Sequence, residues 1–247
     1  MARYQVILAY DGTGFQGSQR QVNIRTVQGE LEKSLRKYGW SGKSVLMAGR
    51  TDTGVHATGQ VAAFEMDWTY TEDKLLRALN ADLPPDIAIR NLTTAPEDFH
   101  PRFDAIARKY SYRLFCESIR NPLREKLAWR VWPVFEESVL QQTADLFLGT
   151  HDFAAFGSRT TPKGTTVRTV TKTEWRKMPD GEWQFEIQAD AFLFRMVRRM
   201  VFVQVAVAQG RCSARDVQIA LSKQKALLSG LAPAHGLTLT EVTYGSH

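Results

Sequence analysis

The sequence is poor in cysteine, because only Cys116 and Cys212 occur among its 247 residues. Two cysteines are too few for a disulfide framework or a cysteine-based zinc site, and so few are typical of a reducing compartment. The five histidines show no metal-ligand spacing, and no His-Glu-x-x-His motif is present. No serine or cysteine lies in a recognisable nucleophile motif. The sequence therefore predicts a cytoplasmic protein without disulfides and without a metal site.

Long hydrophobic runs are also absent. The residues that follow Met1 form no apolar segment typical of a signal peptide. The most apolar stretch, 191–208, contains Arg195, Arg198 and Arg199, and three guanidinium groups would be costly in a lone membrane-spanning segment. We therefore expect this stretch to form a buried helix of a soluble protein.

Positive charge is in excess, because 32 lysines and arginines outnumber 26 aspartates and glutamates. The formal net charge of +6 favours an anionic partner, with nucleic acid ahead of a membrane surface. Hydrophobic residues make up 43% of the chain, and this ordinary globular composition excludes bulk disorder. A chain of this length forms one large domain or two small ones.

The first hundred residues predict the order β-α-β-β-α-β, which is the ferredoxin-like arrangement. Residues rich in β-branched and aromatic side chains predict strands at 3–10, 45–48, 60–66 and 87–92. Apolar residues at helical spacing follow Thr26 and Thr71, and both threonines suit an N-cap.

The second half predicts the same order with longer insertions. Its expected elements are a strand at 108–116, a helix over 139–147, a hairpin of 166–175 with 183–189, a helix at 194–209, a short helix capped by Ser213 and a strand at 237–244. Residues 117–135 and 150–165 match no regular element. We therefore expect an α+β protein of two ferredoxin-like (RRM-like) halves, 1–102 and 103–247, whose antiparallel sheets flank a basic cleft.

Residues 12–17 read Gly-Thr-Gly-Phe-Gln-Gly and match the G-x-G-x-x-G pattern of dinucleotide-binding loops. That fingerprint requires the loop to open directly into a helix, but the polar, basic segment 18–25 intervenes. The mismatch argues against a dinucleotide site. Arg20 and Arg25, beside glycines that permit close approach, suit a phosphodiester chain better, and an ordinary glycine turn is the alternative.

The most informative segment is Gly-Arg-Thr-Asp-Thr-Gly-Val-His-Ala at 49–57, which places Arg50, Asp52 and His56 in one loop between strands. One alternative to catalysis is an Asx-turn, in which Asp52 caps backbone amides. Another is the Asp-Thr-Gly of a dimeric aspartic protease, whose two carboxylates share one proton. The chain holds no second copy of that motif, and Arg50 favours full ionisation of its neighbour, so we rank the protease low.

Two further groups of residues suggest contact with nucleic acid. Arg195, Arg198 and Arg199 are spaced i, i+3 and i+4 and predict one patch on an otherwise apolar helix. Such guanidinium groups either extend to the surface or meet phosphate or carboxylate. Tyr110 and Tyr112 share one face of the strand 108–116, where they either stack on bases or, more often, pack in a core.

Eight motifs occur in an order that matches one known family. The strongest is 49–57, which continues into Gly59-Gln60-Val61. The others are Tyr10-Asp11-Gly12-Thr13 with Phe15 and Gly17, and the segments 25–29, 83–87, 99–103, 108–112, 192–198 and 236–237. On these residues the chain resembles the bacterial tRNA pseudouridine synthase A family over essentially its whole length.

This resemblance implies isomerisation of uridine to pseudouridine at tRNA positions 38, 39 and 40 in the anticodon arm, with base flipping and without cofactor or metal. It also implies a homodimer that binds one tRNA. Asp52 takes the place of the catalytic aspartate, as nucleophile, and Arg50 that of the arginine in its motif. Tyr110 falls at the active-site tyrosine, and Arg198 at the arginine expected to contact the aspartate.

Binding residues follow from the same resemblance and from the basic segments. Leu237 lies at an apolar lining position, and Tyr110 is expected to stack on the uracil. The arginines predicted to bind RNA are Arg20, Arg25, Arg195 and Arg199.

The chain departs from the family pattern at two positions. Ser18 stands where tryptophan is usual, and Phe202 stands where glycine commonly follows the start of the helix. We expect neither to touch the Asp52 motif. A non-catalytic RNA-binding protein and a dimeric aspartic protease remain the competing functional classes.

Overall fold

The predicted strand at 3–10 forms as β1, Ala2–Tyr10, in a computed structural model that describes residues 1–159, 164–223 and 227–245. The order β-α-β-β-α-β is confirmed for the first hundred residues. The elements after β1 are α1 (Val27–Lys37), β2 (Leu46–Met47), β3 (His56–Met66), α2 (Glu72–Asp82) and β4 (Ile87–Ala95). β1 lies between β3 and β4 and pairs antiparallel with both, and β2 pairs antiparallel with β3.

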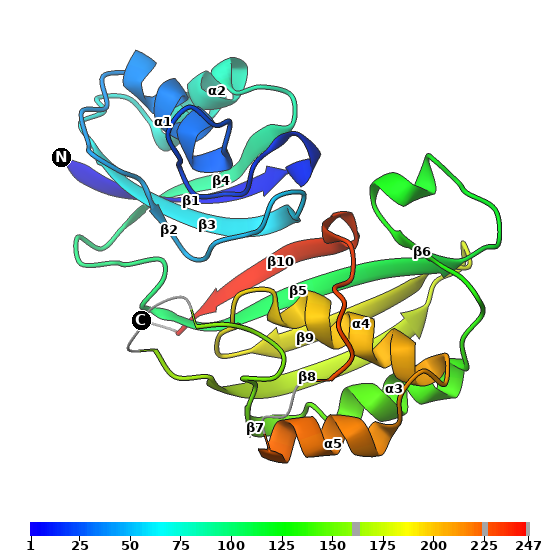
Figure 1. The fold of residues 1–247 in the computed structure, drawn as a ribbon. Helices are drawn as coiled ribbons and strands as arrows, with labels where there is room; N and C mark the ends of the chain where they lie inside the picture. The colour runs from blue at the N-terminus through cyan, green and yellow to red at the C-terminus, as the bar shows by residue number, and fades with distance from the viewer. Residues whose placement is uncertain (160–163, 224–226, 246–247) are drawn as a thin grey trace. The chain divides into compact units, whose positions relative to one another are not determined.

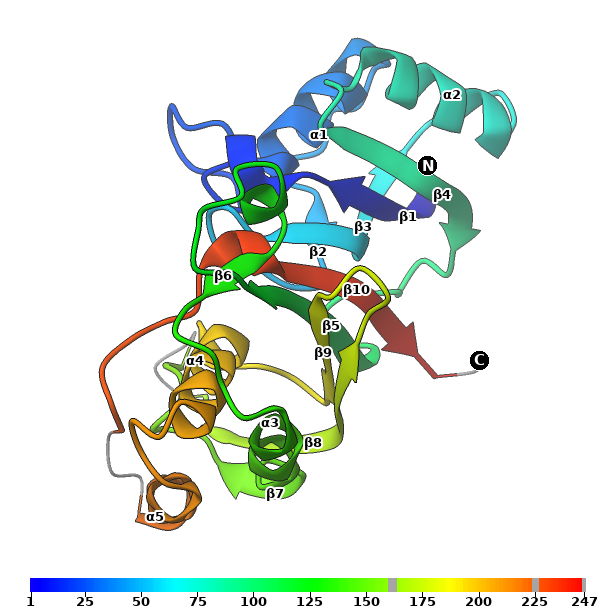
Figure 2. The same ribbon diagram turned by 90° about the vertical axis from the view of Figure 1, so that its right-hand side faces the viewer.

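Both helices begin at the predicted N-caps. The hydroxyl of Thr26 accepts a hydrogen bond from the amide of Gly29 at 3.2 Å, and that of Thr71 accepts from Lys74 at 3.4 Å. These bonds satisfy amides that the first helical turn leaves without partners. The two helices cover one face of the sheet (Figures 1 and 2), and their apolar stripes are buried against it.

β3 begins at His56, four residues before the predicted start at 60. The extra residues pair with neighbours that are distant in sequence, because Tyr10 lies opposite Ala57 and Thr238 lies opposite His56 in a parallel pairing with β10 (Leu237–Tyr244). No local pattern reveals such partners. The loop that carries Asp52 is consequently shorter than the predicted 49–58.

The chain divides into two compact units. The first comprises Met1–Ile106 together with the chain from Thr238 on, and the second comprises Ala107–Leu237. The final strand therefore groups with the N-terminal unit, whereas the sequence assigned it to the C-terminal half. Thr238 and Leu239 of this strand pair with β3 of the N-terminal unit.

The second unit is built on β5 (Ala105–Cys116), β8 (Val167–Lys177) and β9 (Trp183–Ala189), and β9 pairs antiparallel with both of the others. The predicted hairpin is thus confirmed, and Gly181 supplies the positive φ of 78° in its turn. The segments without a predicted element contain two short strands. They are β6 (Trp129–Val131), parallel to β5, and β7 (Gly149–Asp152), antiparallel to β8.

Three helices complete this unit: α3 (Glu137–Asp145), α4 (Met196–Ala208) and α5 (Ala214–Lys223). α3 packs on α4 and β8, and α5 packs on β7 (Figures 1 and 2). Most side chains of α4 are buried, as predicted for this apolar stretch, and within it Gln204 accepts a hydrogen bond from the indole of Trp175 at 2.7 Å. In the parts of the chain that the structure describes, no helix has the length and apolar character needed to cross a membrane.

Candidate active site

The loop that carries Asp52 lies between β2 and β3 and ends in a tight turn. The amide of Val55 donates to the carbonyl of Asp52 at 3.1 Å, and Gly54 has a φ of 78°. A turn of this kind needs positive φ at its third residue, which glycine adopts without strain. A main-chain bond therefore closes the turn. Asp52 is half-buried and Arg50 is exposed.

Thr51, the residue before Asp52, is fixed by three hydrogen bonds. Its amide donates to the hydroxyl oxygen of Ser18 at 2.8 Å, and its carbonyl accepts from the amide of Ser18 at 3.1 Å. Its hydroxyl lies 2.9 Å from that of Tyr10. Burial raises the pKa of Tyr10 to about 12, although hydrogen bonds with Thr51 and Gln60 oppose the rise. Tyr10 is therefore a neutral phenol at physiological pH.

Two glycines of the 12–17 motif allow this loop to approach the segment after β1. A Cβ built on Gly12 would lie 2.1 Å from the carbonyl oxygen of Val55, and one on Gly17 would lie 3.0 Å from that of Thr51. Gly17 also has a positive φ of 88°. Because these glycines have no side chain, the two backbone segments can come into contact. Residues 12–14 form a short 3-10 turn, and α1 begins only at Val27, which agrees with the argument against a dinucleotide site.

His56 joins the same two segments at the start of β3. Its Nδ1 lies 3.0 Å from the amide of Gly12 and 3.1 Å from a carboxylate oxygen of Asp11. The neutral ring can accept from Gly12, whereas a ring protonated at Nδ1 donates to Asp11 instead. Burial opposes ionisation of Asp11, but hydrogen bonds from Thr13 and interactions with His56 outweigh it and lower the pKa of this carboxyl.

The expectation that Ser18 does not touch the Asp52 motif is wrong. Its side chain is only 1% exposed and accepts the hydrogen bond from Thr51 described above. The two residues are 33 positions apart, and a single serine in a polar loop gives no signal of such a contact. Tyr10, which the sequence marks only as part of a motif, likewise contacts this loop through Thr51.

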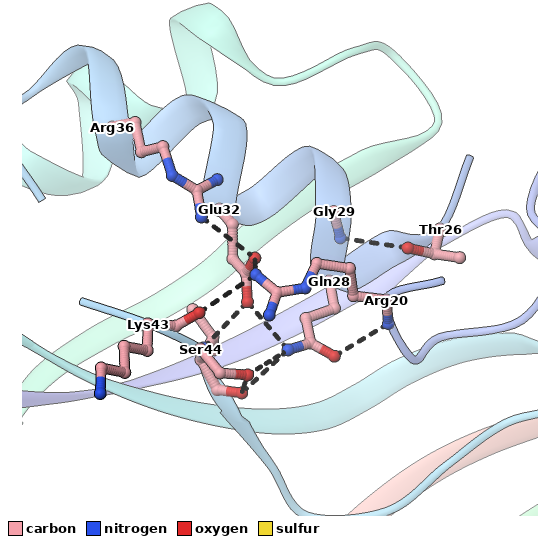
Figure 3. Close-up of polar contacts among 9 residues, drawn as sticks. Arg20, Thr26, Gln28, Gly29, Glu32, Arg36, Lys43 and Ser44 are labelled. Atoms are coloured by element: carbon pink, nitrogen blue, oxygen red, sulfur yellow. Dashed lines mark hydrogen bonds and ion pairs between the residues drawn. The ribbon is translucent and has the colours of Figure 1, made fainter. Parts of the chain in front are cut away.

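Arg20 belongs to a network around the buried carboxylate of Glu32 (Figure 3). Its guanidinium group donates to Glu32 at 2.5 Å and to the carbonyl of Lys43 at 3.1 Å. Glu32 also accepts from the side chain of Gln28 at 2.8 Å and from the amide of Val45 at 3.0 Å. Arg20 therefore has a structural task, and its contact with RNA stays a prediction.

Arg25 is held in a similar way. Two of its nitrogens donate to the two carboxylate oxygens of Asp86, at 2.7 and 2.8 Å, and its guanidinium group lies over the ring of Phe15 at 4.3 Å. The hydrogen bonds to Asp86 raise the pKa of Arg25, although burial opposes the rise. A bidentate pair of this kind fixes the guanidinium plane. The predicted contact of Arg25 with RNA stays a prediction, because these bonds do not test it.

In the second unit, the two tyrosines of β5 differ in environment. Tyr112 is fully buried, and its hydroxyl donates to the carbonyl of Pro233 at 2.9 Å. Burial raises the pKa of Tyr112 well above its usual value, although the charge of Arg198 opposes the rise. Tyr110 is only half-buried and meets the ring of Phe192 edge-on, with 5.1 Å between ring centres. Tyr112 is therefore a core residue, whereas Tyr110 keeps part of its surface accessible.

The three arginines of the apolar stretch do not share one role. Arg195 precedes α4 in a left-handed conformation with a φ of 64°, so the helix starts two residues later than predicted. Its side chain is exposed, with the guanidinium group 4.7 Å from the ring centre of Phe194. Arg198 donates to the carbonyl of Ala232 at 2.8 Å, and Arg199 donates to that of Gly230 at 2.6 Å. The two helical arginines thus hold the segment 230–232 against α4.

Phe202, the second departure, packs under the same segment. A Cβ on Gly230 would lie 2.0 Å from the Phe202 ring, so only glycine fits over this phenylalanine. The next glycine along the chain, Gly236, lies on the ring of Tyr112, where an added Cβ would come within 2.6 Å. Leu237 follows it and is buried.

The structure brings Arg50 and Asp52 together on one loop of the first unit, and it places Tyr110, Arg195, Arg198 and Arg199 in the second unit. Contacts of Asp52 with Tyr110 and Arg198 stay predictions. Among residues 1–159, 164–223 and 227–245, no group of three or more His, Cys, Asp or Glu side chains is arranged to hold a metal ion.

Comparisons with known proteins agree on one family. A family model described as tRNA pseudouridine synthase matches residues 6–104 and 143–245. The chain is similar to tRNA pseudouridine synthase A of Chloroflexus aurantiacus, with 40% identity over 99% of this chain and 89% of the relative. It is also similar to that of Listeria welshimeri, with 37% identity over 99% of this chain and 100% of the relative.

A match to a solved structure is more distant. In the structure described as a Cbf5-Nop10-Gar1 complex, the alignment covers 83% of this chain and 45% of the other, with 12% identity and a TM-score of 0.39. A similarity this low gives no information about the site.

Proposed function

Because the chain belongs to the tRNA pseudouridine synthase family, we propose that Asp52 is the carboxylate with which it converts uridine to pseudouridine at positions 38, 39 and 40 of tRNA. The protein is an isomerase that acts on tRNA, and the family membership argues against both a non-catalytic RNA-binding protein and an aspartic protease. The positions in the anticodon arm, the catalytic residue and base flipping are the parts that we propose.

The reaction moves one bond and one proton and needs no oxidant. The N1–C1′ bond of uridine breaks, the uracil turns, C5 bonds to C1′, and the proton lost from C5 is balanced by one gained at N1. Cleavage develops positive charge on the sugar, and a fixed carboxylate stabilises it. Asp52 can attack C1′ as nucleophile, add to C6 of uracil, or remove the C2′ proton to give a glycal. Nucleophilic attack is the route that we adopt.

The observation that carries this proposal is the attachment of the Asp52 loop. Thr51 is fixed through its amide, carbonyl and hydroxyl, and the Asp52–Val55 turn is closed by a main-chain bond. Catalytic groups must be held close to their productive geometry, and a buried set of hydrogen bonds does so. An acidic residue that served only to shape a turn would not need such support.

Tyr110 and Arg198 have supporting roles in the proposal. The half-buried ring of Tyr110 stacks on the flipped uracil, and its hydroxyl is suited to carry the C5 proton. We assign Arg50, in the same loop, and Arg198 as the arginines that hold the Asp52 carboxylate in its productive rotamer. Leu237 supplies an apolar wall beside the base.

Extraction of a base from a stem costs a few kcal/mol, which phosphate contacts can offset. Arg195 is the best placed of the predicted RNA-binding arginines, because it is exposed beside a hollow of about 480 Å³ in the second unit. Ser158, Arg199 and Gly230 also line this hollow. A phosphate group fits such a basic, open site.

We further propose that each half is ferredoxin-like, that the enzyme is a homodimer and that it acts in the cytoplasm, where tRNA is modified. The strand order β4-β1-β3-β2 with two helices on one face supports the first point for the N-terminal half.

Incubation with an unmodified tRNA transcript tests the proposed function. We expect pseudouridine at one or more of positions 38, 39 and 40, mapped by reverse transcription after chemical derivatisation of pseudouridine, and none in a transcript with cytidine at these positions. Pseudouridine confined to another region of the tRNA would contradict the assigned positions and leave the reaction itself standing.

Replacement of Arg195 by alanine tests the phosphate contact. A side chain that neutralises one phosphate releases about one counterion, so the slope of log Kd against log salt should fall by about 1 in R195A. Arg77→Ala is the control, because Arg77 is exposed on α2 and pairs with Asp73 at 3.0 Å. Equal slopes for R195A and wild type would show that Arg195 does not contact a phosphate of the RNA.

A further inference from the structure

We propose that Ser18 is a positioning residue for the reaction, because its hydroxyl and its amide together fix the residue that precedes Asp52. The inference rests on the proposed role of Asp52 and adds a residue to it. Ser18 lies in the loop between β1 and α1, outside the 49–57 motif, and contacts no reacting atom in this proposal.

Ser18 and Thr51 exchange two hydrogen bonds. The amide of Thr51 donates to the Ser18 hydroxyl oxygen at 2.8 Å, and the amide of Ser18 donates to the Thr51 carbonyl at 3.1 Å. Both residues are buried, with Ser18 only 1% and Thr51 only 7% exposed. A buried amide without a partner costs as much as a lost hydrogen bond, so the Ser18 hydroxyl leaves Thr51 little freedom to turn its peptide plane.

Helix α1 holds Ser18 in turn. The amide of Gln28 donates to the carbonyl of Ser18 at 2.9 Å, and the side-chain oxygen of Gln28 accepts from the amide of Arg20 at 2.9 Å. The side-chain nitrogen of Gln28 donates to the buried carboxylate of Glu32 at 2.8 Å (Figure 3). The Ser18 carbonyl and the Arg20 amide that follows it are therefore anchored to α1, and the serine transmits that rigidity to Thr51.

The geometry separates this role from ordinary packing. The peptide that links Thr51 to Asp52 sets the direction in which the Asp52 side chain leaves the main chain. The Ser18 amide holds this peptide through the Thr51 carbonyl, and the Ser18 hydroxyl holds the preceding Arg50–Thr51 peptide through the Thr51 amide. Without the hydroxyl, the Thr51 amide must find water or another acceptor, the Arg50–Thr51 peptide rotates, and the main chain that leads to Asp52 shifts with it. A displacement of about 1 Å at a catalytic group lowers the rate by about 100-fold, whereas substrate binding through distant contacts is unaffected.

The test is a set of Ser18 variants assayed by single-turnover tritium release from tRNA labelled at C5 of uridine. We expect S18A to lower the rate at saturating enzyme by about 10- to 100-fold while the Kd for tRNA stays within about threefold. S18C has the same connectivity with a slightly larger and poorer acceptor, and it should behave like S18A. S18T keeps a hydroxyl and should recover much of the rate.

Ser34→Ala is the matched control, because Ser34 is a second buried serine of the same unit, and its hydroxyl donates to the carbonyl of Leu79 at 3.5 Å, away from the Asp52 loop. All rates are measured well below the Tm of each variant, so that unfolding of a variant does not lower its measured rate. We expect S34A to keep the wild-type rate within about twofold. A wild-type rate in S18A, a wild-type rate in S18C, or equal losses in S18A and S34A would each overturn the positioning role.

The outcome is distinguishable from a failure of the proposed function. If D52N is active, Asp52 is not the catalytic residue, and the proposed reason for an effect of Ser18 is lost as well. An inactive D52N beside a fully active S18A leaves the catalytic assignment intact and rejects only the role of Ser18.

Discussion

Asp52→Asn should abolish pseudouridine formation and leave tRNA binding intact. Asparagine has nearly the shape of aspartate, and the main-chain bond from Val55 closes the turn without the carboxylate, so the loop should keep its conformation. The neutral amide cannot act as nucleophile or stabilise positive charge on the sugar. We expect turnover to fall by about 10⁴-fold or more, the scale on which removal of a catalytic carboxylate acts.

The measurement is tritium release from C5-labelled tRNA, together with the Kd for tRNA at fixed salt. The Kd of D52N should stay within about threefold of the wild-type value. Asp67→Asn is the control, because Asp67 is exposed just after the end of β3. Substantial turnover by D52N would falsify the catalytic assignment, and an equal loss in D67N would show that the effect is not specific to the loop.

Gly12→Ala should give the second large effect, through sterics alone. The new Cβ would lie 2.1 Å from the carbonyl oxygen and 2.5 Å from the carbonyl carbon of Val55, and neither atom belongs to a flexible side chain. The backbone at one end of the Asp52 turn must therefore move. Overpacking of this kind lowers the free energy of unfolding by about 1–3 kcal/mol. Movement of the loop by about 1 Å should lower turnover by about 100-fold.

Gly14→Ala is the matched control, because both glycines belong to the same 3-10 turn and an added methyl group would meet main-chain atoms only at Gly12. At Gly14 the nearest atoms are the side-chain ends of Arg25, at 2.9 Å, and Asp86, at 3.2 Å, which can move together as a pair while their hydrogen bonds are kept. We expect G14A to change the free energy of unfolding, measured by urea denaturation, by less than about 1 kcal/mol. Equal stability and equal turnover in the two variants would show that contact with Val55 does not constrain Gly12.

The sequence alone determined the features that depend on neighbours along the chain. Thr26 and Thr71 predicted the starts of α1 and α2, because an N-cap is a local hydrogen bond. Alternating side chains and turn residues predicted β1, the β8–β9 hairpin and the order of the elements, since these patterns have periods of a few residues. The 49–57 motif also marks Asp52 as the candidate catalytic residue, and the comparisons with known proteins confirm the family that this motif indicates.

Tertiary structure alone decided which distant residues meet. The extension of β3 to His56 depends on β10, and the fixation of Thr51 depends on Ser18 and Tyr10. The contact of Arg20 with the buried carboxylate of Glu32 is of the same kind, because the two residues come from different segments of the fold, and the RNA contact of Arg20 stays a prediction. Local propensity reflects the energies of short segments, whereas these contacts gain their free energy only when the fold desolvates both partners together.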